Sequence, residues 1–139
     1  MNNLETNVVG NEELALPSIR VREDDLRRLT ALADSTMELF PRVAQFLARE
    51  LDRATVVPTE TDLHGVIRMG SEATYRDEES GATRTIVLVY PHEANIERNR
   101  VSILTPVGAA LIGLSTGQRI DFQAPGGEAK SLTVLAVSE

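Results

Sequence analysis

Cysteine and tryptophan are both absent from this chain of 139 residues, and aromatic residues make up only 4% of it. Without a thiol, the chain can form neither a disulfide framework nor a thiolate metal site, and it has no cysteine nucleophile. Three Phe and two Tyr are too few to build a deep aromatic pocket or a platform on which nucleic-acid bases stack.

The sequence also lacks any long apolar run, and it has no basic start followed by an apolar stretch. Neither a membrane span nor a secretory signal is therefore predicted, and we expect a soluble protein of the cytoplasm. Hydrophobic residues make up 42% of the chain, which is enough for one real core. The length favours a single compact domain with a small appendage.

Positive charge is scarce, because 14 Lys and Arg residues face 21 Asp and Glu residues and the formal net charge is −7. Phosphate binding requires a basic field, so we expect a basic protein surface rather than nucleic acid as the main partner. Lys130 is the single lysine, and Arg20, Arg22, Arg27 and Arg28 gather near the start of the first expected helix. These arginines form either a solvated helix face or a polar docking edge.

The N-terminal part reads as a leader followed by a helical arm. Residues 1–17 show no sustained periodicity and are expected to be a flexible leader. Residues 18–57 are expected to form a short helical hairpin, which follows a short strand at 18–21. Apolar spacing predicts one helix over 24–33 and a second over 41–54, opened by Pro41. A short loop makes the two helices antiparallel neighbours.

Residues 58–139 are expected to form a sheet domain with one short helix, so the predicted fold class is α+β. Residues 56–60 read as a linker. Six strands are predicted, at residues 62–69, 72–77, 83–90, 100–104, 119–123 and 131–137, with 83–90 as the central strand. Pro125-Gly126-Gly127 is expected to turn the chain before the last strand.

The segment after the fourth of these strands has the signals of a capped helix. Thr105 can cap its start, Pro106 occupies the first helical position, where a missing N–H has no cost, and Gly113 stops it.

This segment and its surroundings resemble the C-terminal domain of the GreA/GreB transcript-cleavage factors. The resemblance is carried by Ser102-Ile103, Pro106, Gly108, Ala110-Leu111, Gly113, Gly117 and Pro125-Gly126-Gly127, with Met69-Gly70-Ser71 upstream. Leu88-Val89-Tyr90-Pro91 and Glu50-Leu51-Asp52-Arg53-Ala54 look closest to the subgroup called regulator of nucleoside diphosphate kinase (Rnk). The resemblance covers about residues 20 to 138.

The resemblance implies an antiparallel, FKBP-like sheet domain that docks at the rim of the secondary channel of bacterial RNA polymerase. Carried over to this chain, the docking residues are Ser102, Thr105, Pro106 and Gly108. The same residues have a purely structural explanation as a cap, a helix start and a close backbone approach, and both interpretations stay open.

In the resembled factors, acidic residues at the tip of a much longer coiled coil help to hold a catalytic magnesium ion. The expected tip here comprises Asp34, Ser35, Met37 and Glu38. Its arm is far shorter, and two carboxylates alone rarely satisfy the octahedral demand of Mg²⁺. We therefore expect ordinary solvated acids, no cofactor and no transcript cleavage. The chain would be a non-enzymatic regulator that competes with longer channel-binding factors.

Two alternatives remain from the sequence. An FKBP-like domain could be a residual prolyl isomerase, although the shortage of rings argues against its pocket. The subgroup name leaves open direct binding to nucleoside diphosphate kinase, with polymerase irrelevant. His64 and His92 show no ligand or triad pattern and are expected to be surface or packing residues.

Overall fold

The chain folds as a helix hairpin followed by a five-stranded sheet with one short helix, which is the expected α+β class. The structure, a computed structural model, describes residues 16–124 and 126–138. Its elements in chain order are β2 (Arg20–Arg22), α2 (Glu23–Thr36), α3 (Pro41–Arg53), β3 (Thr55–Val57), β4 (Glu72–Asp77), β5 (Thr83–Val89), the 3₁₀ turns η1 (Pro91–Glu93) and η2 (Ile96–Arg98), β6 (Arg100–Ser102), α4 (Pro106–Leu111), β7 (Arg119–Gln123) and β8 (Ala129–Ser138). Pro125 and almost all of the predicted leader lie outside the described residues.

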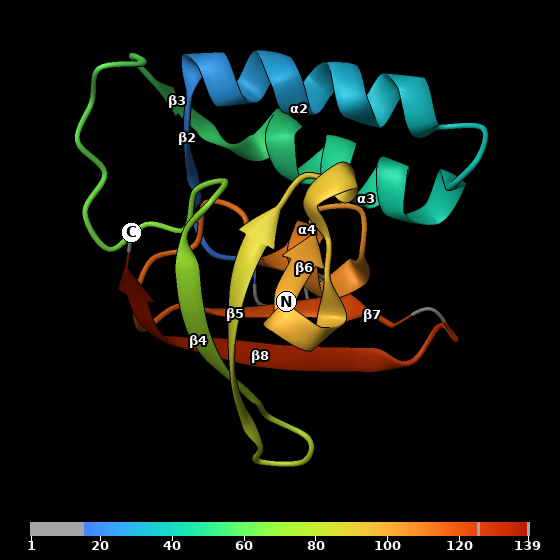
Figure 1. Ribbon diagram of the computed structural model, residues 1–139, viewed down its shortest axis with the longest axis vertical. Helices are drawn as coiled ribbons and strands as arrows, with labels where there is room; N and C mark the ends of the chain where they lie inside the picture. Colours follow the sequence, from blue (N-terminus) through green and yellow to red (C-terminus); the bar gives the residue numbers. More distant parts are fainter. Residues whose placement is uncertain (1–15, 125, 139) are drawn as a thin grey trace, which may run out of the picture.

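The predicted pair of short antiparallel helices is confirmed, and Figure 1 shows α2 and α3 running back along each other. Acidic residues in the first turn of α2 favour its start. The helix continues past its predicted end at residue 33 as far as Thr36, and in its last turn the hydroxyls of Ser35 and Thr36 donate to the carbonyl oxygen of Leu32 over 3.1 and 2.7 Å. Asp34 and Ser35 therefore belong to the last helical turn rather than to the loop.

The predicted linker at 56–60 is partly wrong, because β3 pairs in parallel with β2. Val21 lies opposite Val56, and the N–H of Thr55 donates to the carbonyl oxygen of Ile19 over 2.9 Å. The guanidinium of Arg53 also donates to the carbonyl oxygen of Pro17. The hairpin returns the chain to its own entry point, and that return creates the strand pair.

The large sheet has the strand order β6-β5-β4-β8-β7, so β4 rather than β5 is the middle strand. Its pairs are antiparallel except for β5 and β6, which run parallel. The sheet is therefore mixed, whereas an antiparallel one was expected. Residues 91–99 connect β5 to its parallel neighbour β6. The last of them, Asn99, adopts the left-handed backbone conformation with φ of 58°. The FKBP-like arrangement stays a prediction.

The strand predicted at 62–69 is wrong, because only one isolated bridge joins Val66 to Ser115 there. Gly65 has φ of 70°, which breaks an extended run. The apolar side chains that suggested a strand are nevertheless buried, among them Leu63 and Ile67. The N–H of Ile67 donates to the carbonyl oxygen of Leu114 over 2.8 Å, so the segment packs as an irregular layer.

One hydrophobic core joins the hairpin to the sheet. Leu29 of α2 and Leu47 of α3 belong to the same buried cluster as Ile86 of β5 and Ile120 of β7. Helix α4 lies below the helix pair and above β7 in Figure 1, and it contacts both α3 and β7. The division into an arm (18–57) and a sheet domain (58–139) stays a prediction. Within the described ranges, no helix is both long and apolar enough to cross a membrane.

Candidate protein-docking surfaces

The turn from β6 into α4 is held by hydrogen bonds among its own residues. The Thr105 hydroxyl accepts from the N–H of Gly108 over 3.0 Å and donates to the carbonyl oxygen of Ser102 over 2.7 Å. The Ser102 hydroxyl accepts from the N–H of Leu104 over 2.9 Å, and Pro106 occupies the first helical position. The turn is therefore rigid before any partner arrives.

Gly108 is buried, and its position explains why no other residue fits there. A Cβ atom added to Gly108 would lie 2.2 Å from the carbonyl oxygen of Ser102 and 3.0 Å from the Cα of Ile103. Gly108 can therefore act only by shaping the turn, and it cannot contact a partner directly. Ser102, Thr105 and Pro106 are half-buried and meet at one place, and their docking role stays a prediction.

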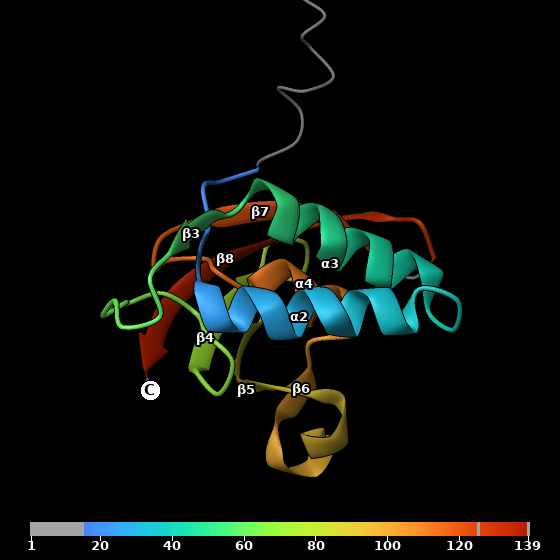
Figure 2. The same cartoon turned by 90° about the horizontal axis from the view of Figure 1, so that it is seen from above.

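A loop that the sequence reading did not single out stands beside this turn. Residues 91–99 are all exposed, and Ile96 is 86% exposed. The Asn95 side chain accepts from the N–H of Glu97 over 3.1 Å, and the N–H groups of Asn95 and Arg100 bond each other's carbonyl oxygens. Figure 2 shows this loop projecting away from the rest of the molecule. Pro91 and the two asparagines that follow it, Asn95 and Asn99, are turn-forming residues and could have indicated this loop from the sequence.

The two histidines lie apart and at the surface. His92 stacks on Tyr90 with ring centroids 6.5 Å apart. His64 lies 2.8 Å from the carboxylate of Asp62, and both side chains are exposed. Neither histidine is buried beside an orienting group.

The structure does not bring the expected tip residues together as a cation site. Asp34 and Ser35 are exposed at the end of α2, while Met37 and Glu38 lie in the connection, with Met37 half-buried. In the part of the chain that the structure describes, no three His, Asp or Glu side chains cluster as metal ligands.

The more unusual feature of the tip is apolar, and the sequence reading missed it. Leu39 is 75% exposed and Phe40 is 51% exposed. From the sequence, Leu39-Phe40-Pro41 restarts the helical pattern, and the apolar stripe expected for the second helix comprises Val43, Phe46, Leu47, Leu51 and Ala54. Leu47 and Leu51 of that stripe are buried, and Val43, Phe46 and Ala54 are partly buried against the core.

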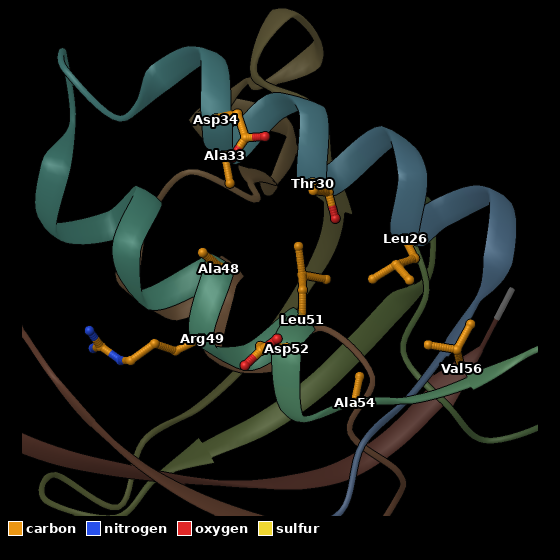
Figure 3. A pocket seen from close by; sticks show the side chains of 10 residues that line it. All are labelled: Leu26, Thr30, Ala33, Asp34, Ala48, Arg49, Leu51, Asp52, Ala54 and Val56. Atoms are coloured by element: carbon orange, nitrogen blue, oxygen red, sulfur yellow. The ribbon is translucent and has the colours of Figure 1, made fainter.

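A shallow groove of about 580 Å³ runs between α2 and α3 (Figure 3). Leu26 and Leu51 lie along it, and Asp34, Arg49 and Asp52 add charged groups. Its charges are of both signs, so the groove favours no particular ionic ligand.

A smaller cleft of about 210 Å³ lies on the sheet side, and two aromatic residues are among those that line it. Tyr75 and Phe122 line it together with Val107 of α4. Charged side chains of Asp77, Arg84 and Lys130 also line this cleft, and its volume is about that of one large side chain.

Charged residues at the start of α2 affect one another and Tyr90, which follows β5. Burial raises the pKa of Asp25, and the neighbouring Asp24 raises it further, while Arg28 and two other arginines oppose the shift. Burial also raises the pKa of Tyr90, against the effect of Arg28. Arg20, Arg27 and Arg28 are all exposed, and Arg22 is half-buried. A solvated helix face and a polar docking edge both stay open as interpretations of this group.

Two family models match the chain. Residues 61–139 match the model described as "Transcription elongation factor, GreA/GreB, C-term", and residues 17–57 match "Rnk N-terminus". Among solved structures, a prokaryotic transcription elongation factor GreA/GreB from Nitrosomonas europaea aligns with a TM-score of 0.68 and 34% identity. That alignment covers 89% of this chain and all of the solved chain.

Curated relatives agree with these matches. The regulator of nucleoside diphosphate kinase from Escherichia coli K12 is 34% identical over 122 residues, which cover 88% of this chain and 90% of that protein. The transcription elongation factor GreA of Ruegeria pomeroyi is 38% identical over 77 residues, which cover 55% of this chain but only 49% of the relative. The chain therefore belongs to the GreA/GreB family of transcription elongation factors, with an N-terminal part of the Rnk type.

Proposed function

We propose that the protein is a regulator that binds RNA polymerase at the rim of the secondary channel, competes there with longer Gre-type factors and does not support transcript cleavage. The sheet half supplies the docking surface, and the helix hairpin faces the channel. The family assignment supports the general role in transcription elongation. The shortness of the hairpin supports the absence of transcript cleavage.

The length of the hairpin is the observation that carries the proposal. Helix α2 has 14 residues and α3 has 13. At 1.5 Å per residue they span only about 21 and 20 Å. Both helices also bury residues in the common core, so the arm lies along the body for much of its length. Such an arm cannot carry acids deep into a channel, whereas the cleavage factors have a much longer coil.

The docking surface proposed is the exposed part of Ser102, Thr105 and Pro106. Their backbone is already fixed by the hydrogen bonds of the turn, so little conformational entropy is lost on binding. The net charge of −7 favours a basic protein surface as the partner.

Co-purification with core RNA polymerase tests this proposal directly. We expect the wild-type chain to bind and to be displaced by a full-length Gre-type cleavage factor. The Pro106→Glu variant should bind at least tenfold more weakly, because a charge is placed in the contact. An acid at the first helical position is compatible with the helix dipole, so the fold is kept. Ser80→Glu, in the exposed turn after β4, is the matched control. Unchanged binding of the Pro106 variant would disprove the docking assignment.

A cleavage assay on backtracked elongation complexes tests the short-arm argument. We expect no RNA shortening above background when this protein is added alone, and inhibition when it is added with a cleavage factor. RNA shortening that disappears in an Asp34→Asn variant would contradict the proposal.

Direct binding to nucleoside diphosphate kinase is the second candidate. It is favoured by the name of the Escherichia coli relative, which aligns over 88% of this chain. A pull-down with purified nucleoside diphosphate kinase, in the absence of polymerase, separates the two. Stable capture there, together with no binding to polymerase, would favour this candidate.

A further inference from the structure

The connection between α2 and α3 exposes apolar surface that the fold does not need to expose. Six large hydrophobic side chains are exposed within residues 16–124 and 126–138, and only Leu39 and Phe40 are neighbours in sequence. Elsewhere the hairpin buries its apolar residues, including Leu29, Leu47 and Leu51. Single exposed apolar residues are common, but two neighbouring ones at the end of the helix hairpin favour contact with another molecule.

The backbone that carries these two side chains is fixed. The N–H of Phe40 donates to the carbonyl oxygen of Thr36 over 2.8 Å, and the carbonyl oxygen of Phe40 accepts from the N–H of Ala44 over 2.9 Å. Pro41 restrains the next position. The pair is thus presented in one backbone conformation, which lowers the entropic cost of inserting it into a partner.

Charges around the pair indicate the chemistry of the partner. Asp34 and Glu38 are exposed beside it, and Arg42 is exposed at the start of α3. The chain as a whole carries a net charge of −7. An anionic bilayer and a nucleic-acid backbone would both repel such a surface, because each requires a basic counterpart. A protein recess with an apolar floor and a mainly basic border fits it.

We infer that the hairpin tip is a second contact with polymerase, in which Leu39 and Phe40 insert into an apolar, basic-bordered recess of the protein near the channel entrance. The inference rests on the proposed function. It assigns the tip an anchoring role, and its acids act as charged neighbours of the anchor. The end of the hairpin lies at one side of the molecule, beyond the strands that it covers (Figure 1).

The test compares the affinity of full-length variants for core polymerase. Leu39→Ser and the double variant with Phe40→Ser remove the anchor, and Leu135→Ser on β8, also an exposed apolar residue, is the control. We expect roughly a tenfold loss of affinity for the double variant and less than a twofold change for the control. Thermal unfolding should show similar midpoints for Leu39→Ser and the wild type, because the Leu39 side chain is mostly exposed.

A crosslinking experiment gives a second readout that does not depend on removing a side chain. A photoreactive amino acid at position 39 should crosslink to polymerase, and the same group at position 135 should not. Equal affinity of the double variant and the wild type, or no crosslink from position 39, would overturn the inference while the proposed function stands.

Failure of the wild-type chain to bind polymerase would disprove both the proposed function and the tip contact. Binding of the wild type to vesicles containing phosphatidylserine, lost in Leu39→Ser, would overturn the inference in favour of a membrane contact.

Discussion

At the scale of single residues, the turn into α4 depends on the absence of one side chain. Gly108 has an ordinary negative φ, so its conformation does not require glycine. The requirement comes from the carbonyl oxygen of Ser102, which occupies the place of a Cβ.

We predict that Gly108→Ala lowers the free energy of unfolding by about 2 kcal/mol, because the backbone of the turn must shift to admit the methyl group. Chemical denaturation measures this change. Gly126→Ala is the control, since its Cβ would approach only the flexible side chain of Glu128, at 3.7 Å. A Gly108 variant as stable as the wild type would contradict the close approach.

A second prediction concerns Glu78, whose side chain accepts hydrogen bonds from Thr133 and Arg76. These bonds lower the pKa of Glu78 below its ordinary value of 4.5, and the bond from Thr133 has the largest effect. A lowered folded-state pKa gives stability that is present above the unfolded pKa and is lost as the pH falls through the folded one. Glu78→Gln should therefore lower the melting temperature at pH 7, and the difference should shrink as the pH falls below the ordinary pKa of 4.5. A difference that is constant with pH would show that the charge is not involved.

At the scale of elements, the end of α3 is tied to the entry of the chain. Glu50 is only 3% exposed, and its carboxylate lies 2.6 Å from the guanidinium of Arg53. Arg53 also donates to the carbonyl oxygen of Pro17. The Glu-Leu-Asp-Arg-Ala segment, noticed in the sequence as an Rnk-type signature, thus has a physical role in closing the hairpin on its own start.

We predict that Arg53→Met destabilises the fold by about 3 kcal/mol, because a buried carboxylate loses its cation. Adding Glu50→Gln to this variant should restore part of the lost stability, because no buried charge is then left without a partner. The restored part measures the charge effect, and the remainder measures the lost packing of the Arg53 side chain. Arg49→Met, on the exposed side of the same helix, should change stability by less than about 0.5 kcal/mol. Denaturant unfolding checks all three variants, and equal effects of the Arg49 and Arg53 variants would refute the account.

At the scale of the whole molecule, the hairpin and the sheet share one core. Leu47 is fully buried in the cluster that includes strands of the sheet, and α3 packs on α4. Helices this short are marginal in isolation, so the body stabilises the arm and the arm covers the body. This arrangement keeps the arm close to the sheet.

We predict that the arm and the sheet unfold together. Leu47→Ala should cost about 3 kcal/mol and should reduce hydrogen-exchange protection in β5 as much as in α2. Gln45→Ala, exposed on the same helix, serves as the control. Loss of protection confined to the hairpin would instead establish the arm as a separate unit.

The sequence by itself determined the features that neighbouring residues specify. The spacing of apolar residues and Pro41 determined the two helices, and Thr105 with Pro106 determined the start of α4, because caps and periodicity act over a few positions. The glycines and prolines of the sheet half were likewise enough to indicate the family, because their spacing can be read directly from the sequence.

Only the tertiary structure decided what depends on surfaces that meet from distant parts of the chain. The pairing of β2 with β3, the parallel step to β6 and the irregular burial of residues 62–69 all rest on long-range hydrogen bonds. The exposure of Leu39 and Phe40 was decided in the same way, because an apolar residue is buried only if the folded chain supplies a neighbour to cover it.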